Sequence, residues 1–178
     1  MSDSQAYVRP SEPIGGSAAW RGDQLDARSD WHWQVGDDAF DGNGEPGPAL
    51  RALAREISTA LTAGPGVALL HGFPIDEPGV DERFLRFTGL LGTHVVQNRT
   101  SGLIRHIRDN GGSRVESPAR LNFHTDRADL VALLTLSMAA EGGVSRIVSA
   151  VEIHDTLLRE RPDLLQVLYE PFHRSSVG

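Results

Sequence analysis

Cysteine is absent from the 178-residue sequence. Disulfide bonds, zinc–cysteine sites, iron–sulfur clusters and thiol nucleophiles are therefore excluded. A metal ion would have to be bound by histidine, aspartate, glutamate or water, and these donors suit iron or manganese. No apolar run is long enough to span a membrane, and the polar, acidic N-terminus lacks the apolar region of a secretory signal. We therefore expect a cytoplasmic protein with no membrane partner.

Positive charge is also scarce, because the 17 Lys and Arg residues are outnumbered by 24 Asp and Glu residues, which gives a net charge of -7. A nucleic-acid-binding protein needs a basic face to neutralise phosphates, so we expect no nucleic-acid partner. The sequence lacks the Gly-x-Gly-x-x-Gly, P-loop and Gly-x-Ser-x-Gly motifs as well. Dinucleotide-binding, nucleotide-hydrolysing and α/β-hydrolase functions therefore lose their usual support.

The rest of the composition, 39% hydrophobic and 23% charged, is that of one globular domain. Residues 1–17 are rich in Ser, Pro and Gly and are predicted to form a flexible lead-in, which leaves residues 18–178 as the domain. Apolar spacing predicts helices over residues 49–63, 81–91, 151–161 and 162–169. Short apolar runs predict strands over residues 67–73, 93–97, 103–107, 130–138 and 145–150.

The order of these predicted elements favours one class of fold. Helices precede a series of short strands, and the two do not alternate regularly. We therefore predict an α+β protein, a β-sandwich or jelly roll with flanking helices, in preference to a doubly wound parallel sheet.

The strongest candidate for chemistry is a His-x-Asp pair formed by His124 and Asp126. Side chains two residues apart on an extended segment project to the same side, so that one metal ion can bind both. Such a pair and one distant histidine form the facial triad of non-haem Fe(II) oxygenases. A surface histidine beside a turn-capping aspartate is the alternative interpretation. His71, near the end of an apolar run, is interpreted as a packed or capped histidine rather than a ligand.

Several segments together resemble the taurine dioxygenase-like (TauD/TfdA) family of Fe(II)- and 2-oxoglutarate-dependent oxygenases. They are Gly-Val-Ala-Leu-Leu-His-Gly-Phe at 66–73, Phe-His-Thr-Asp at 123–126 and Gly-Gly-Val-Ser at 142–145. The most specific feature is the order of the last two. The resemblance implies a double-stranded β-helix, which is a cupin-like jelly roll, with Fe(II) as cofactor, 2-oxoglutarate as cosubstrate and a small-molecule substrate.

The resemblance also implies roles for individual residues. His124 and Asp126 would be two iron ligands, and the Ser145 hydroxyl would contact 2-oxoglutarate. Asp129 would lie in the second coordination shell. Three further residues are candidates to reach the substrate: Asn98, Arg120 and Asn122.

The sequence departs from the family pattern at its C-terminal side. The family's distal iron-binding histidine and the arginine that pairs with 2-oxoglutarate are expected beyond residue 178, so the β-helix is expected to be incomplete. His173 and Arg174 stand in a connecting segment after a predicted helix and are not assigned these two roles.

Three functions remain open. The first is an Fe(II)/2-oxoglutarate-dependent dioxygenase that hydroxylates or oxidises a C–H bond and holds two of its three protein ligands. The second is a non-catalytic binding or scaffold module, because an incomplete β-helix exposes strand edges and apolar surface that favour association into a homo-oligomer. The third is a His/Asp metal-dependent hydrolase, which would work with zinc and without 2-oxoglutarate.

Overall fold

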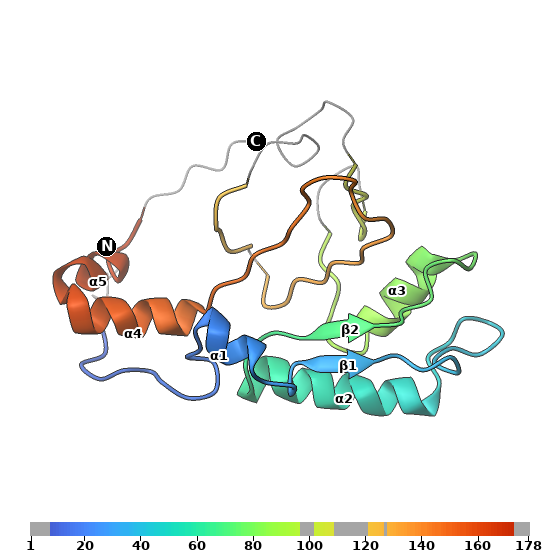
Figure 1. Cartoon of the computed structure of the whole chain (residues 1–178), viewed down its shortest axis with the longest axis horizontal. Helices are drawn as coiled ribbons and strands as arrows, with labels where there is room; N and C mark the ends of the chain where they lie inside the picture. The colour runs from blue at the N-terminus through green and yellow to red at the C-terminus, as the bar shows by residue number, and fades with distance from the viewer. Residues whose placement is uncertain (1–7, 97–101, 109–120, 127, 173–178) are drawn as a thin grey trace, which may run out of the picture. The chain divides into compact units, whose positions relative to one another are not determined.

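A computed structural model describes residues 8–96, 102–108, 121–126 and 128–172 (Figure 1). The chain divides into two compact units, which we describe separately. The first unit comprises the residues up to 31, residues 60–67 and the residues from 148 onward. The second unit comprises residues 32–59 and 68–147. No helix in the part of the chain that the structure describes is long and apolar enough to cross a membrane.

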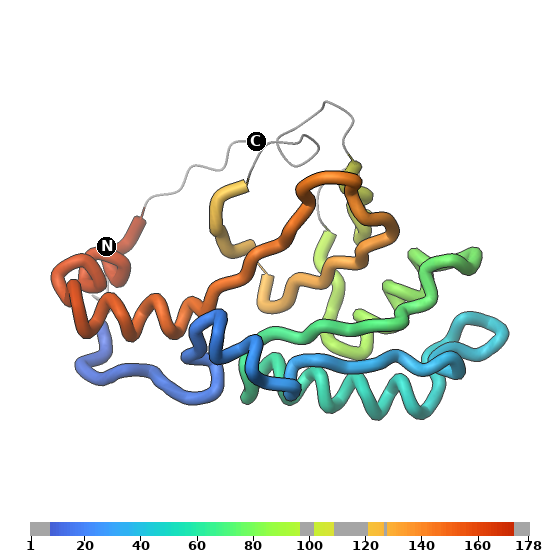
Figure 2. The backbone as a smooth tube through the Cα atoms, in the orientation of Figure 1, coloured from blue at the N-terminus to red at the C-terminus, as the bar shows by residue number. Residues whose placement is uncertain are grey.

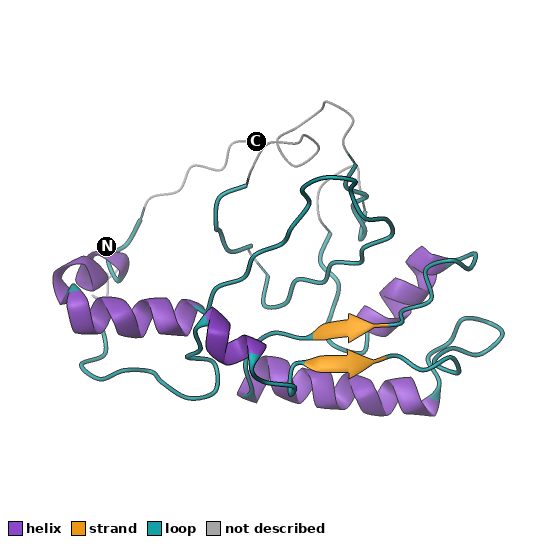
Figure 3. Ribbon diagram, in the orientation of Figure 1, coloured by secondary structure: helices purple, strands orange, loops and turns teal. Residues whose placement is uncertain are grey.

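The second unit begins with a strand–helix–strand arrangement, although residues 60–63 at the end of the helix are counted with the first unit. Strand β1 (His32–Gln34) is followed by helix α2 (Pro48–Ala63) and strand β2 (Leu69–His71). The two strands pair in parallel, and α2 runs in the opposite direction to them (Figure 3). A parallel pair needs such a crossover because a tight turn can join only antiparallel neighbours.

Helix α2 forms because its apolar residues recur at helical spacing. Leu50, Ala54 and Ile57 lie at i, i+4 and i+7, and each is at most 2% exposed. This spacing places them on one face of the helix, which is the face that is buried. The helix ends at Ala63, as the Gly-Pro-Gly sequence at 64–66 predicted.

Helix α3 (Val80–Thr88) follows β2 in the same unit and is positioned by aromatic packing. The Phe73 ring lies 6.1 Å from the Phe84 ring and 6.0 Å from the Phe87 ring, both on α3. Phe73 also meets Phe40 at 5.6 Å in an edge-to-face contact. Such contacts contribute about 0.5–1.5 kcal/mol each beyond burial, so Phe73 links α3 to the loop after β1.

The first unit contains the short helix α1 (Gly22–Asp26) and the helices α4 (Ala150–Glu160) and α5 (Pro162–Leu168). Its buried apolar residues include Trp20, Leu25 and Leu165, which are 6%, 3% and 1% exposed. The Trp20 indole Nε1–H donates to the Pro65 carbonyl at 2.9 Å. This bond satisfies the one polar atom of the buried indole.

The predicted helices are confirmed to within a few residues, but most of the predicted strands are wrong. β2 lies inside the predicted strand 67–73. Residues 93–96, 103–107, 130–138 and 145–148, by contrast, are irregular (Figures 1 and 2). A strand needs a neighbouring strand for its backbone hydrogen bonds, and apolar composition does not supply one. Residue 97 lies outside the described residues.

The described helices and the small parallel sheet do not confirm the predicted α+β class with its jelly roll. The two named strands form a sheet of order β1–β2 in the described part of the chain. The β1–α2–β2 arrangement was not foreseen, because β1 is three residues long and carries a tryptophan between two polar residues.

Candidate metal centre

His124 lies in an irregular, solvent-exposed segment of the second unit. Its Nδ1 is 2.7 Å from the carbonyl oxygen of Asn122. A carbonyl can only accept a hydrogen bond, so Nδ1 carries the proton in this pair and Nε2 of the neutral ring keeps a free lone pair. Metal-binding histidines commonly donate their second nitrogen in this way. The local geometry of His124 therefore suits a ligand that binds through Nε2.

The other predicted site residues, Asp126, Asp129 and Ser145, are also exposed. Ser145 follows a turn in which Gly142 and Gly143 have positive φ angles of 75° and 69°. Glycine is the residue that adopts this conformation without a steric penalty, which accounts for the Gly-Gly pair. Within the described ranges, no group of three or more His, Asp or Glu residues is placed to hold a metal ion.

Four residues that the sequence analysis weighed lie outside the described residues: Asn98, Arg120, His173 and Arg174. The substrate contacts of Asn98 and Arg120 therefore stay predictions. The expectation that His173 and Arg174 do not serve as third iron ligand and 2-oxoglutarate partner also stays a prediction. Asn122 is described, and its backbone carbonyl holds the His124 ring. The predicted substrate contact of its side chain stays a prediction.

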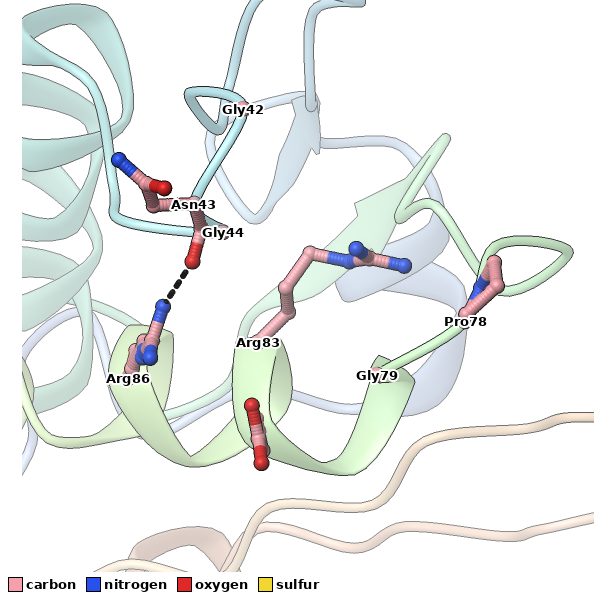
Figure 4. Close-up of a pocket in the computed structure, with 8 residues that line it drawn as sticks. Gly42, Asn43, Gly44, Pro78, Gly79, Arg83 and Arg86 are labelled. Atoms are coloured by element: carbon pink, nitrogen blue, oxygen red, sulfur yellow. Dashed lines mark hydrogen bonds between the residues drawn. The ribbon is translucent and has the colours of Figure 1, made fainter.

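A small pocket of about 180 Å³ opens elsewhere in the second unit, between the Gly42–Gly44 loop and α3 (Figure 4). None of the predicted site residues lines it. Arg86 Nη1 donates to the Asn43 carbonyl at 2.5 Å, and Arg83 extends toward the loop that carries Pro78 (Figure 4). These arginines hold the two loops, and the pocket offers no imidazole for a metal.

Arg83 is the unusual residue of this pocket because it is 8% exposed and its Nε and Nη2 have no hydrogen-bond partner among the described residues. Its Nη1 makes an ion pair with Glu77 at 3.3 Å. Glu82 also lines the pocket. Because Glu77 pairs with the Arg83 guanidinium and Glu82 adds a second negative charge to the pocket lining, the pocket does not favour an additional anion.

Sequence reasoning missed a hydrogen-bonded chain in the first unit. The Asp155 carboxylate accepts from the backbone N–H groups of Ile14 and Gly15, both at 2.8 Å, and its Oδ1 is 2.9 Å from His154 Nδ1. His154 Nε2 in turn lies 2.9 Å from the Tyr169 hydroxyl. The bond from His154, with those from the two amides, holds the pKa of Asp155 below its ordinary value. These hydrogen bonds join residues 14 and 15 to α4 and α5. The partners are far apart in the sequence, so a local sequence pattern does not reveal the bonds.

Ser149 was missed although a local signal was present. Its Oγ accepts from the Glu152 backbone N–H at 2.9 Å and caps the N-terminus of α4. It also donates to the Ala18 carbonyl at 2.5 Å. The Ser-x-x-Glu pattern of Ser149 and Glu152 is the sequence signature of a helix start, and the predicted strand over 145–150 obscured it.

Comparison with known proteins gives two matches. The family model described as "Taurine catabolism dioxygenase TauD, TfdA family" matches residues 31–178. FR-33289 synthase from Streptomyces rubellomurinus (strain ATCC 31215) is 31% identical over 189 residues, covering 89% of this chain and 56% of the synthase. The chain thus spans about half the length of this curated relative. The comparison with solved structures found no match.

Proposed function

This chain belongs to the TauD/TfdA family, and from that premise we propose that it is the part of an Fe(II)- and 2-oxoglutarate-dependent dioxygenase that supplies two of the iron ligands. The reaction would be hydroxylation or oxidation of a C–H bond in a small molecule. Residues 18–178 would form the oxygenase domain, with residues 1–17 as a lead-in, and the complete fold would be the double-stranded β-helix. Family membership supports an oxygenase-type enzyme; the cofactor and the reaction are the proposed steps.

The observation that carries the proposal is the state of His124 within the matched region. Its Nδ1–H is used by the Asn122 carbonyl, so its Nε2 is the nitrogen left for an ion. Asp126 is two residues further on and exposed to solvent, as a ligand must be before the ion arrives. The pair supplies one nitrogen and one oxygen donor, which fits Fe(II).

Ser145 is proposed to bind the cosubstrate through its hydroxyl. A hydroxyl can donate a directed hydrogen bond to a carboxylate of 2-oxoglutarate, and such bonds fix the orientation of a ligand in a mostly apolar site. The Gly142–Gly143 turn ends two residues before Ser145. When bound, iron with 2-oxoglutarate would supply the oxidation of the C–H bond.

Two protein ligands bind a metal ion less firmly than three. Among the described residues, no three histidine or carboxylate side chains lie close enough together to bind one metal ion. We therefore expect weak Fe(II) binding and slow turnover by this chain alone. Succinate formation coupled to 2-oxoglutarate consumption at the rate of a full-length family member would contradict the two-ligand proposal.

Anaerobic titration of the chain with Fe(II) tests the ligand assignment. His124→Ala and Asp126→Ala should each remove the Fe(II) binding that this pair supplies, because each removes one donor of the pair. His106→Ala is the matched control: His106 is another exposed histidine of the same unit, and its Nε2 is 2.8 Å from Asp81 Oδ2. Undiminished Fe(II) binding by both His124→Ala and Asp126→Ala would refute the assignment.

A second candidate function rests on exposed apolar side chains. In the irregular part of the second unit Phe123 is 63% exposed, Leu133 is 73% exposed and Met138 is 81% exposed. Exposed apolar surface of this kind favours association, so a non-catalytic binding or scaffold module, including a homo-oligomer, is the alternative. Size-exclusion chromatography with light scattering tests it, because a stable monomer across the accessible concentration range would count against the alternative.

A further inference from the structure

We propose that His32 and His71 form a separate site for a divalent transition-metal ion on the exposed face of the β1–β2 sheet. His32 Nδ1 and His71 Nε2 lie 3.1 Å apart, although the two residues are 39 positions apart in the sequence. The site belongs to the second unit and shares no residue with the His124–Asp126 pair. His71 is exposed, so the sequence-based interpretation of it as a packed histidine is wrong, and its role as a ligand belongs to this proposal.

The sheet register places the two imidazoles together. His32 is opposite Leu69, and Gln34 is opposite His71, so His32 and His71 are diagonal neighbours on adjacent strands. Exposure alternates along both strands, with His32 and His71 on the exposed side. The Val35 N–H donates to the His71 carbonyl at 2.8 Å and extends the pairing beyond the strands. The backbone of both histidines is thus fixed before any ion binds.

The spacing of the two nitrogens fits a shared ion. Two nitrogens that each lie about 2.0–2.1 Å from a metal at an angle of roughly 90–110° are about 2.9–3.4 Å apart. The observed 3.1 Å falls within that range. The rings are nearly parallel, with an interplanar angle of 12°. Each ring would therefore have to turn about its Cβ–Cγ bond to aim its lone pair at the ion, and both side chains are exposed to solvent.

The donor chemistry selects the ion. Two neutral imidazoles suit Zn²⁺, Ni²⁺ and Cu²⁺, whereas Mg²⁺ and Ca²⁺ prefer oxygen ligands. Water would occupy the remaining coordination positions. An ion held by both side chains would replace the hydrogen bond between them. It would also join β1 to β2, two neighbouring strands that α2 connects in the sequence. Because binding requires the folded sheet, the ion would stabilise the second unit by mass action.

Isothermal titration of the full chain with Zn²⁺ tests the proposal, with Mg²⁺ as the control ion. The background variant His124→Ala/Asp126→Ala removes the proposed iron ligands, so the outcome does not depend on the proposed function. In this background Zn²⁺ should still bind and should raise the melting temperature. Adding His32→Ala or His71→Ala should abolish both effects, and adding His106→Ala, a matched exposed histidine, should preserve them.

Undiminished Zn²⁺ binding by the His32→Ala and His71→Ala variants would overturn the proposal, as would failure of the background variant to bind Zn²⁺. A second measurement covers the case in which either histidine variant fails to fold. The Cu²⁺-loaded background protein should show hyperfine coupling to two imidazole nitrogens by electron paramagnetic resonance. A spectrum with one coupled nitrogen, or with none, would overturn the proposal independently of the variants.

Discussion

Two serines four residues apart, Ser145 and Ser149, should differ in how removal of the hydroxyl group changes the free energy of unfolding. Ser149 is 5% exposed, and its Oγ makes one bond as acceptor and one as donor. Ser145 is exposed and is proposed to serve the cosubstrate. Ser149→Ala should therefore lower the free energy of unfolding, whereas Ser145→Ala should leave it unchanged.

The magnitude for Ser149 follows from its two bonds. Loss of the helix cap at the Glu152 N–H costs about 1 kcal/mol. Loss of the neutral hydrogen bond to the Ala18 carbonyl costs about 1 kcal/mol more. The sum of about 2 kcal/mol corresponds to a change of about 30-fold in the folding equilibrium. Ser149→Gly separates the two contributions, because glycine at a cap costs only a few tenths of a kcal/mol and the bond to Ala18 is still lost.

Urea denaturation followed by far-UV circular dichroism measures these differences. If the slope of the unfolding free energy against urea concentration is the same for each variant, unfolding exposes the same amount of surface. Ser149→Thr keeps the hydroxyl and is the matched control, with a smaller loss than Ser149→Ala. A Ser149→Ala protein within about 0.5 kcal/mol of the wild type, the usual range for surface substitutions, would refute the reasoning. So would a Ser145→Ala protein as unstable as Ser149→Ala.

Three further substitutions test other parts of the structure. Ile57→Ala should lower the unfolding free energy by about 2–5 kcal/mol, because Ile57 is 1% exposed and its removal leaves a cavity; a loss below about 1 kcal/mol by urea denaturation would contradict its place in the core. Gly72→Ala should cost at least about 1–2 kcal/mol, since Gly72 has a φ of 76° and a new Cβ would meet Gln34 and the Val35 carbonyl; wild-type stability would disprove the strain. Asp155→Asn should lose stability in a pH-dependent way, measured by thermal melting. Because the folded-state pKa of Asp155 is below the ordinary value of 3.8, its contribution is full above that value and disappears as the pH falls through the lowered pKa. A difference from the wild type that persists at the lowest pH would count against this linkage.

Local sequence pattern was enough to predict helices α2 to α5, although not the short helix α1. The apolar spacing that placed helix α2 and the Gly-Pro-Gly sequence that ended it act within one or two turns of the chain. The Arg161–Pro162 boundary between α4 and α5 was predictable for the same reason, because proline is favoured in the first turn of a helix. The Phe-His-Thr-Asp motif followed by the Gly-Gly-Val-Ser motif also predicted the family correctly.

The sequence alone thus determined helices α2 to α5, the family and the types of donor available to a metal ion, since each depends on neighbouring residues or on composition. Tertiary structure decided which residues meet. It paired His32 with His71 through the register of a three-residue strand pair, and it joined Asp155 to Ile14 and Gly15 across more than a hundred residues. It also left residues 130–138 without a strand partner, despite their apolar pattern. Helical hydrogen bonds close within four residues, whereas strand pairs and buried carboxylates depend on partners whose position only the folded chain defines.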